Sequence, residues 1–355
     1  MARLLTIGVP KETKPMEARV ALVPHAVAEL VSQGFTVWVE HSAGELSGYP
    51  DAQYLAAGAR IASSANELFA QGQLIVKVKE PVAGDLALLQ AHHLLFCFLH
   101  LAPNPALSRR LCDIGLTAVA FESVQLGQRL PLLAPMSEIA GRVAVQAGVH
   151  YLHRSMGGKG VLLGGVAGAA PGKVVVVGAG VAGQNAARAA AATGAQVVAF
   201  DRNGDALRTI EAIAPNITGM YSYQEAIAQA MVDADLVVGA VLVPGARAPH
   251  VVSREMVRAM PDGGLIVDIS IDQGGCVETI RATDYRDPVY TEEGVLHMGV
   301  TNMPGAVPRT ASEALSGAIL SYVQRLGIGQ LREYAPLSDG INVSAGKIVL
   351  PALLE

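Results

Sequence analysis

Short apolar runs alternate with helix-like segments along almost the whole chain. In the first third of the sequence, the runs with the length of buried strands are residues 4–9, 36–39, 74–78, 94–99 and 117–121. Helix-like segments such as residues 25–33 and 105–111 lie between them. Strands that alternate with helices form parallel sheets covered on both faces. The pattern therefore predicts an α/β domain in this part of the chain.

A second series of the same kind begins at residue 173. Its strand-like runs are residues 174–177, 196–200, 236–240 and 265–269, and a helical segment at 184–192 follows the first of them. With 355 residues, the chain is about twice the usual size of one domain. We therefore expect an α/β protein with two doubly wound parallel-sheet domains.

Two further helices bear on the domain boundary. Residues 137–155 form one long alanine-rich helical segment, which is a candidate for crossing from one domain to the other. The last predicted helix, residues 310–326, has no strand series of its own. Its pairing with the first domain is a hypothesis from the pattern alone.

Composition and charge exclude several classes of protein. Apolar residues make up 51% of the chain and charged residues 16%, with a net charge of −5, which argues against disorder and against a nucleic-acid-binding surface. No apolar run reaches the roughly 20 residues of a membrane helix, and Lys11 follows too soon for a signal peptide. The three widely spaced cysteines are typical of a reducing compartment and show no zinc spacing. We expect a cytoplasmic protein with no bound metal, no membrane partner and no nucleic-acid partner.

A dinucleotide signature follows the first strand of the second series. Gly178 is placed to make the tight turn, Gly180 to let the backbone approach a pyrophosphate, and Gly183 to let the helix pack on the strand. The next strand leads into Asp201, which is placed to accept the ribose hydroxyls of NAD and to repel a 2′-phosphate. A coincidental glycine turn is the alternative. The neighbouring Arg202 also keeps NADP open, but NAD is the predicted cofactor.

Polar residues at other strand ends give candidate chemistry, because ligands of open parallel sheets bind beyond the carboxyl ends of the strands. Lys79, His100 and Asp272 follow predicted strands, and Arg19 lies in the loop after the first strand. They supply two cations for a carboxylate, a histidine for proton transfer and an acid to orient it. Taken singly, each has a structural alternative that is the more common one: a solvated charge for Lys79, a core histidine for His100, a turn cap for Asp272 and a surface ion pair for Arg19.

The other histidines of these regions do not suggest a metal site. We expect them on the surface or on helices, without a metal-binding spacing. They are His92, His93, His150 and His153.

Several long motifs give the chain a family resemblance. They occupy residues 8–14, 19–21, 76–81, 98–102, 131–138, 157–165, 239–245, 268–276 and 302–310. With these motifs, the chain resembles the alanine dehydrogenase family, which also contains the NAD-binding subunit of proton-translocating transhydrogenase. The resemblance covers roughly residues 4 to 325.

The resemblance implies a reaction and a role for each strand-end residue. Arg19 and Lys79 match the residues that hold the substrate carboxylate. His100 matches the catalytic acid/base, and Asp272 matches an aspartate near the amine and the attacking water. The implied reaction is the reversible, NAD-dependent deamination of a small L-amino acid, L-alanine, to the 2-oxo acid pyruvate and ammonia.

The resemblance also implies cofactor contacts, topology and assembly. Together with the glycine turn, it assigns to NAD the positions Ser137, Gly178, Gly180, Val181, Ala182, Gly183, Asp201, Ser222, Val241, Leu242, Ile269, Asp272, Arg281, Val300, Thr301, Asn302 and Met303. It predicts a substrate domain of residues 1–131 and 306–355, to which the last helices return, and an NAD-binding domain of residues 132–305. Family members often form homohexamers.

Departures from the family pattern leave the substrate and the assembly open. Ala206 stands where the family usually has a lysine, the helix over 311–322 differs, and the C-terminal tail is shorter. Alternatives are a dehydrogenase of another amino or imino acid, a transhydrogenase-like NAD(H)-binding subunit and a non-catalytic dinucleotide-binding or regulatory protein. The resemblance favours the dehydrogenase, because the transhydrogenase subunit lacks the Leu99-His100 pair and differs over 303–308.

Overall fold

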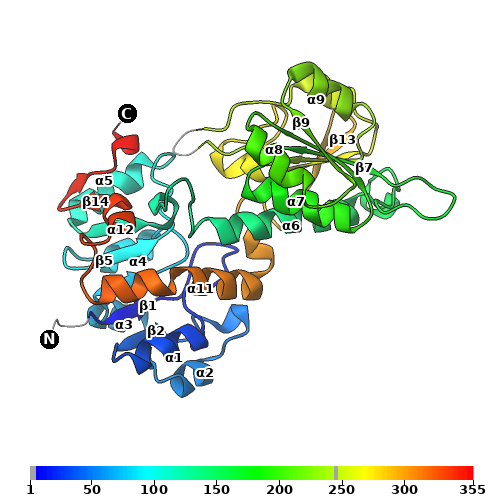
Figure 1. Ribbon diagram of the computed structural model, residues 1–355. Helices are drawn as coiled ribbons and strands as arrows, with labels where there is room; N and C mark the ends of the chain where they lie inside the picture. The colour runs from blue at the N-terminus through cyan, green and yellow to red at the C-terminus, as the bar shows by residue number, and fades with distance from the viewer. Residues whose placement is uncertain (1–4, 244–246, 355) are drawn as a thin grey trace. The chain divides into compact units, whose positions relative to one another are not determined.

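The computed structural model describes residues 5–243 and 247–354 (Figure 1). The chain divides into two compact units, one of Met1–Met136 with Val307–Glu355 and the other of Ser137–Ala306. Leu4 of the first predicted strand and the last two residues of the 239–245 motif lie outside the described residues.

The first unit is built on a sheet with the strand order β15-β14-β6-β5-β4-β1-β2-β3. Its strands are β1 Ile7–Val9, β2 Val37–Glu40, β3 Arg60–Ala62, β4 Leu74–Val76, β5 Leu94–Cys97, β6 Thr117–Ala120, β14 Ile341–Ser344 and β15 Lys347–Ile348. Strands β1 to β6 are parallel, whereas β14 and β15 are antiparallel to their neighbours. The strand order reverses between β1 and β4, where Ile7 pairs with both Val37 and Leu74.

Helices surround this sheet. They are α1 Pro24–Ser32, α2 Asp51–Ala56, α3 Ala65–Gln71, α4 Ala83–Leu88, α5 Pro105–Ile114, α11 Pro308–Gly327 and α12 Ala335–Asp339, with 3-10 turns η1 Glu45–Ser47, η2 Phe121–Ser123 and η6 Pro351–Leu353. Helix α5 shows why such segments start and stop where they do. Asn104 caps the N–H of Leu107, and Gly115 ends the helix in the left-handed region. Helix α11, late in the sequence, packs against α1.

The second unit has a sheet with the order β12-β13-β11-β10-β7-β8-β9. Its strands are β7 Lys173–Val177, β8 Gln196–Asp201, β9 Ile217–Tyr221, β10 Leu236–Gly239, β11 Leu265–Asp268, β12 Tyr290–Glu292 and β13 Val295–Met298. All pairings are parallel except the one between β12 and β13. The order reverses between β7 and β10, as in a dinucleotide-binding fold.

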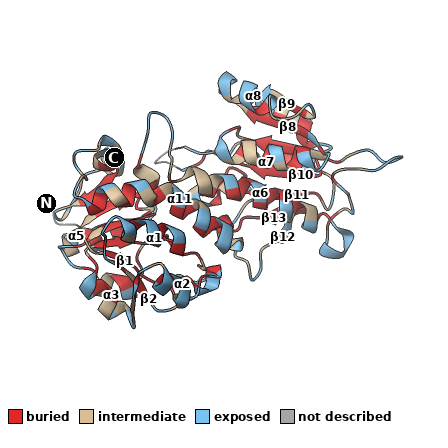
Figure 2. Cartoon of the chain, turned by 60° about the horizontal axis from the view of Figure 1, so that its bottom comes forward, coloured by how far each residue is buried: buried red, intermediate tan, exposed pale blue. Residues whose placement is uncertain are grey.

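The helices of the second unit flank its sheet, and the boundary between the units falls within the long helix α6. The elements are α6 Ala134–Tyr151, α7 Val181–Ala192, α8 Gly204–Glu211, α9 Gln224–Met231 and α10 Arg254–Arg258, with 3-10 turns η3 Arg154–Met156, η4 Ile269–Gln273 and η5 Met303–Ala306. Buried residues fill the strands and the inward sides of the helices (Figure 2). The valines of β7 form part of this core.

These findings confirm the predicted α/β class with two doubly wound sheets and the return of the C-terminal helices to the first unit. Two details differ from the prediction. The C-terminal segment also adds the antiparallel hairpin β14–β15 to the first sheet, and β12 is antiparallel at an edge of the second. These short strands lack the continuous apolar runs that identify the central ones.

Candidate functional site

In the first unit, the candidate substrate residues follow the central strands at their carboxyl ends. Arg19 lies in the loop after β1, Lys79 follows β4, and His100 follows β5. Strands β1, β4 and β5 are neighbours in the sheet, so the topology brings these segments to the same edge.

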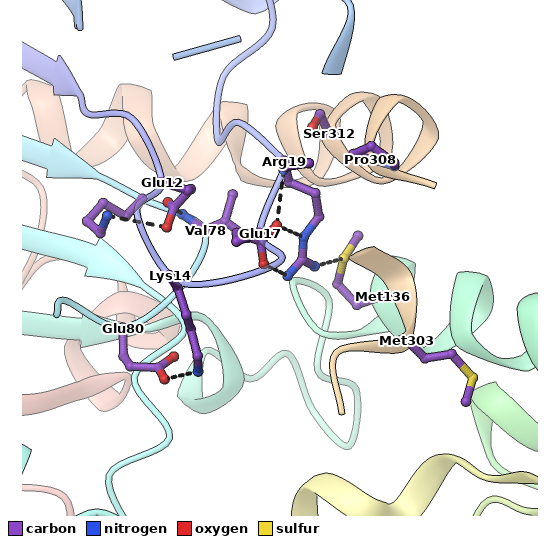
Figure 3. A network of polar contacts seen from close by, with 12 residues as sticks. Glu12, Lys14, Glu17, Arg19, Val78, Glu80, Met136, Met303, Pro308 and Ser312 are labelled. Atoms are coloured by element: carbon purple, nitrogen blue, oxygen red, sulfur yellow. Dashed lines mark hydrogen bonds and ion pairs between the residues drawn. The ribbon is translucent and has the colours of Figure 1, made fainter. Parts of the chain in front are cut away.

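Arg19 is buried and is held by Glu17. The side chain of Arg19 is 2% exposed, and its Nε and Nη2 donate to the two carboxylate oxygens of Glu17 at 2.7 and 2.6 Å (Figure 3). Its Nη1 lies 3.1 Å from the Sδ of Met136. Burial alone would raise the pKa of Glu17, but the hydrogen bonds and charge of Arg19 outweigh it and lower that pKa; the charge of Lys79 acts in the same direction. Arg19 is therefore not a surface ion pair.

The loop that carries Arg19 is fixed by serines from other elements. The N–H of Val20 donates to the Oγ of Ser312 at 2.9 Å, and the N–H of Val23 donates to the Oγ of Ser316 at 3.1 Å. The Oγ of Ser47 donates to the carbonyl of Ala18 at 2.7 Å. Helix α11 and turn η1 thus hold the backbone on both sides of Arg19.

Lys79 is 7% exposed and adjoins a buried charge cluster. Within the cluster, Lys77 is 1% exposed, and its Nζ lies 3.3 Å from carboxylate oxygens of both Glu12 and Asp85. The second oxygen of Glu12 accepts the N–H of Val78 at 2.7 Å, which ties the β1 loop to the end of β4. Burial alone would lower the pKa of Lys77, but the two carboxylates raise it above its ordinary value, so Lys77 stays charged.

His100 has a left-handed backbone, with φ 47°. Positive φ in a residue with a side chain is uncommon and often marks a functional site. Glu122, in η2, secures this conformation by accepting the N–H groups of Leu99 and His100 at 3.1 and 2.6 Å. The imidazole stacks on Phe98 with 5.7 Å between ring centroids, and its side chain is 36% exposed. His100 is therefore accessible and is not a core histidine.

In the second unit, the glycine turn has the geometry that its sequence predicts. Gly178 has φ 105°, and a Cβ there would stand 2.4 Å from the carbonyl oxygen of Ala240. A Cβ on Gly183 would stand 1.7 Å from the carbonyl oxygen of Gly178, so α7 packs too closely on the turn for any side chain. Among the described residues, apart from Gly180 and its chain neighbours, no heavy atom lies within 4 Å of a Cβ built on Gly180. The backbone at the start of α7 is thus open to a pyrophosphate, which fits a dinucleotide.

Asp201 ends β8 beside this turn. Its Oδ2 accepts the N–H of Ala179 at 2.7 Å, and its Oδ1 accepts the N–H of Asn203 at 2.8 Å. Ser222 donates its N–H to the carbonyl of Asp201 at 3.1 Å. The carboxylate is therefore fixed next to the glycine turn, with lone pairs left for ribose hydroxyls.

Asp272 lies exposed in η4, directly after β11. Ile269 opens the same turn and is half-buried. The turn follows Asp268, whose fully buried side chain accepts the N–H of Ser270 at 2.9 Å. Val241 and Leu242 lie just after β10, the strand beside β11. Val241 is half-buried and Leu242 is 50% exposed.

The remaining cofactor positions lie on two further segments and on α6. The guanidinium of Arg281 stands 4.0 Å from the ring centroid of Tyr290, whose hydroxyl accepts the N–H of Arg281 at 2.7 Å. Residues 300–303 follow β13, and Asn302 has φ 63°. Val300 and Met303 are buried, Thr301 is exposed, and Ser137 is half-buried in α6.

Sequence reasoning missed several acids that hold these candidates in place. They are Glu12, Glu17, Glu122 and Asp268. Three of them carry the signal that identified their neighbours: Asp268 and Glu122 stand at or just beyond strand ends, and Glu17 precedes Arg19 by two residues. Acids in loops are commonly solvated, so none is conspicuous without the fold.

The described part of the chain has neither a membrane-spanning helix nor a metal cluster. Within residues 5–243 and 247–354, no helix combines the length and the apolar content needed to cross a membrane. Over the same ranges, no group of three or more His, Cys, Asp or Glu side chains is arranged to hold a metal ion.

Comparison with known proteins places this geometry in a family. Residues 8–140 match the family model "Alanine dehydrogenase/PNT, N-terminal domain", and residues 144–351 match the corresponding C-terminal domain. Alanine dehydrogenase of Methanococcus maripaludis is 46% identical over 99% of this chain and 96% of its own length. That of Mycobacterium tuberculosis is 47% identical over 97% and 95%.

Solved structures agree with the sequence relatives. An L-alanine dehydrogenase structure superposes with a TM-score of 0.94 at 47% identity, over 98% of both chains. A transhydrogenase from Sinorhizobium meliloti gives 0.85 at 26% identity, over 98% of this chain and 99% of that one. The chain therefore belongs to the alanine dehydrogenase/PNT family.

Proposed function

We propose that this protein catalyses the reversible, NAD-dependent oxidative deamination of L-alanine to pyruvate and ammonia. The observation that carries the proposal is the pair of buried cations, Arg19 and Lys79, at the switch point of the first sheet. The relatives named alanine dehydrogenase, which match nearly the full length of the chain, support it.

Arg19 and Lys79 would bind the α-carboxylate of the substrate. Glu17 binds Nε and Nη2 of the guanidinium, and this ion pair holds the Arg19 cation in a fixed orientation. Because both cations are buried, a carboxylate between them is attracted more strongly than at the surface. This fixed position orients Cα for the reaction, which is a proximity effect.

The second unit would hold the nicotinamide dinucleotide, and NAD rather than NADP. The open N-terminus of α7 fits the pyrophosphate, and the carboxylate of Asp201 would repel a 2′-phosphate. When bound, NAD supplies the hydride acceptor for the hydrogen on Cα.

His100 and Asp272 would manage the protons. Loss of a hydride from Cα and of a proton from nitrogen converts the amino acid to an iminium ion. His100 takes a proton from the water that attacks this carbon and returns it to the departing nitrogen, so that ammonia and pyruvate form. The negative charge of Asp272 stabilises the cationic iminium and orients the water.

The assembly is a further part of the proposal. We expect a homo-oligomer, a hexamer by family resemblance, because relatives of this family often assemble in this way. Light scattering coupled to gel filtration measures the mass of the particle. A monomeric mass would contradict this part and leave the chemistry untouched.

The test is NADH formation from NAD by the purified protein at alkaline pH, with L-alanine, D-alanine and a panel of other L-amino acids. We expect a signal with L-alanine, none with D-alanine, a weaker one with NADP, and NADH consumption with pyruvate and ammonia. Activity with a different L-amino acid alone would relocate the substrate. NADH binding without any amino-acid-dependent reduction would overturn the proposal in favour of a transhydrogenase-like subunit.

A further inference from the structure

Asp268 is a buried carboxylate that has no part in the chemistry described so far. It is the last residue of β11, and its side chain is fully buried. Its Oδ1 accepts the N–H of Ser270 at 2.9 Å. Its Oδ2 accepts the N–H groups of Cys276 and Val277 at 2.7 and 3.1 Å. One side chain therefore bonds both ends of the segment 270–276.

The segment that Asp268 closes is tightly built and carries Asp272 near its middle. The N–H of Gly275 donates to the carbonyl of Ser270 at 3.0 Å, and that of Gly274 to the carbonyl of Ile271 at 2.9 Å. Gly274 and Gly275 have φ of 94° and 81°, which side-chain-bearing residues rarely adopt. A Cβ on Gly275 would stand 3.0 Å from the Oδ2 of Asp268, so the loop backbone lies directly against the carboxylate.

The hydrogen-bond pattern requires a carboxylate at this position. Both oxygens accept from backbone N–H groups, and the thiol of Cys276 also lies 3.6 Å from Oδ1. Burial raises the pKa of Asp268, while the donated hydrogen bonds oppose that rise. An asparagine has the same shape but would turn an NH₂ group toward one of these donors, leaving a buried N–H without an acceptor.

Neighbouring strands give this carboxylate a fixed support. Asp268 pairs in register with Gly239 of β10, and a Cβ on Gly239 would stand 2.6 Å from the Sγ of Cys276 and 3.0 Å from the Oδ1 of Asp268. The residue after Gly239, Ala240, touches the glycine turn at Gly178. The closed segment is thus braced against the strand ends at the switch point, and a change at Asp268 acts first on the segment.

We infer that Asp268 is a positioning residue for the reaction: it holds the segment 270–276 in the conformation that presents Asp272. The inference rests on the proposed function, in which Asp272 acts on the iminium ion and the water. Asp268 itself touches no reacting atom in this scheme. Its effect reaches the reaction through the backbone N–H groups of Ser270, Cys276 and Val277.

The experiment compares Asp268→Asn with Asp235→Asn. Asp235 is a matched control, because it is 6% exposed in the same unit, accepts the N–H of Lys173 at 2.7 Å and pairs with Lys159 at 2.6 Å. It directly precedes β10 and so lies at the amino ends of the strands, whereas Asp268 lies at their carboxyl ends. The measurements on each full-length variant are kcat and KM for L-alanine, the Kd of NADH by fluorescence, and Tm.

We expect both variants to lose thermal stability and only Asp268→Asn to lose turnover. Its kcat should fall about tenfold or more, with KM for L-alanine within about threefold of the wild-type value. Asp235→Asn should keep kcat within about twofold. Equal kcat in the two variants would overturn the inference. If Asp268→Asn does not fold, Gly275→Ala disturbs the same closure from the loop side and should give the same loss.

A double variant separates positioning from general damage. If Asp268 acts through Asp272, Asp268→Asn combined with Asp272→Asn should be about as slow as Asp272→Asn alone. Losses that multiply would contradict the inference. Hydrogen exchange of the backbone amides of residues 269–277 reports on the segment in the absence of substrate. This exchange should be faster in Asp268→Asn than in Asp235→Asn. Failure of the proposed function shows separately, as a wild-type protein that does not reduce NAD with any amino acid.

Discussion

The two sheets of this protein reverse their strand order in the same way but offer opposite chemistry at the reversal. In the first unit, the loops after β1 and β4 carry the buried cations Arg19 and Lys79, and the buried carboxylate of Glu17 holds Arg19 in place. In the second, the ends of β7 and β10 meet as bare backbone, with Gly178 against the carbonyl of Ala240. The same position in the fold thus carries two kinds of chemistry, and in the proposed function each kind binds a different anion.

The difference follows from what each ligand needs. A small carboxylate has one charged end, and two side-chain cations can hold it in one orientation. A pyrophosphate is larger and must approach the backbone closely, so side chains are removed and N–H groups bind it. The charged site requires counter-charges such as Glu17 to keep its cations in place, whereas the glycine site requires tight packing. Substitutions in the two sites should therefore have different effects on turnover, stability and NADH binding.

The largest expected effect is on catalysis by the first unit, which carries the charged residues. His100→Ala should lower kcat by about 10² to 10⁴-fold, because a positioned general acid/base contributes that much. The Kd of NADH, measured by fluorescence, should stay nearly unchanged. His92→Ala, at an exposed position before β5, is the control and should be active. A parallel loss of turnover and NADH binding in His100→Ala would argue for a structural role.

Next comes the stability of the charge cluster. Lys77→Met leaves Glu12 and Asp85 buried without their cation, which should cost about 3–5 kcal/mol of unfolding free energy in urea titrations. Lys173→Met removes a lysine that pairs with the exposed Asp233, and should cost much less. Similar losses in the two variants would mean that the buried cluster contributes no more than a surface pair.

The ion pair of Arg19 should make the stability depend on acid pH. The pKa of Glu17 is below its ordinary value of 4.5, so its stabilisation is present above that pH and is lost as the pH falls through the lowered pKa. Glu17→Gln should be less stable by roughly 1.5–3 kcal/mol at neutral pH, with a shallower decline in acid. Denaturation from pH 7 to 3 measures both. The control Glu29→Gln, at an exposed helix position, should keep the wild-type profile.

The glycine turn of the second unit should be sensitive to the addition of a single methyl group. Gly183→Ala places a Cβ 1.7 Å from a carbonyl oxygen and should cost roughly 1–3 kcal/mol of stability, with weaker NADH binding. Gly180→Ala has room in the protein and should keep its Tm, but should still weaken NADH binding by obstructing the pyrophosphate. Unchanged NADH affinity in Gly180→Ala would remove the pyrophosphate from this turn.

The smallest expected effect concerns the choice of cofactor. Asp201→Ala should lower the ratio of kcat/KM for NAD over NADP about tenfold, or ~1.4 kcal/mol, because a 2′-phosphate is no longer repelled. Asp205→Ala, which removes an exposed acid four residues later, is the control. An unchanged ratio in Asp201→Ala would refute the ribose assignment.

The central strands were predictable from the sequence, but the strands at and near the edges of the sheets were not. The run of valines in β7 is buried on both faces and needs no context to be read as a strand. Strand β3 has an exposed arginine, and β9 has exposed positions through most of its length, so neither shows a continuous apolar run. The hairpin β14–β15 joins the first sheet by a long-range pairing that local sequence does not indicate.

Of the candidate site, the strand-end rule selected the cations and the histidine but not the acids that position them. Glu122 and Asp268 act by accepting backbone N–H groups, which leaves no periodic signal in the sequence. The expectation that His93 lies on the surface was wrong. His93 is 1% exposed, because its Nδ1 accepts the N–H of Gln90 and its Nε2 donates to the carbonyl of Phe69, both at 2.9 Å, which satisfies the buried ring.

The serines of α11 have a consequence for biosynthesis. Ser312 and Ser316 secure the loop around Arg19, and β14 covers the edge of β6, yet these partners leave the ribosome about 200 residues after β6. At usual synthesis rates, that interval is on the order of 10–40 s, during which the second unit is synthesised while the first sheet still has an open edge. The loop around Arg19 is thus one of the last segments to be secured in the nascent chain, and truncation near the C-terminus should loosen it.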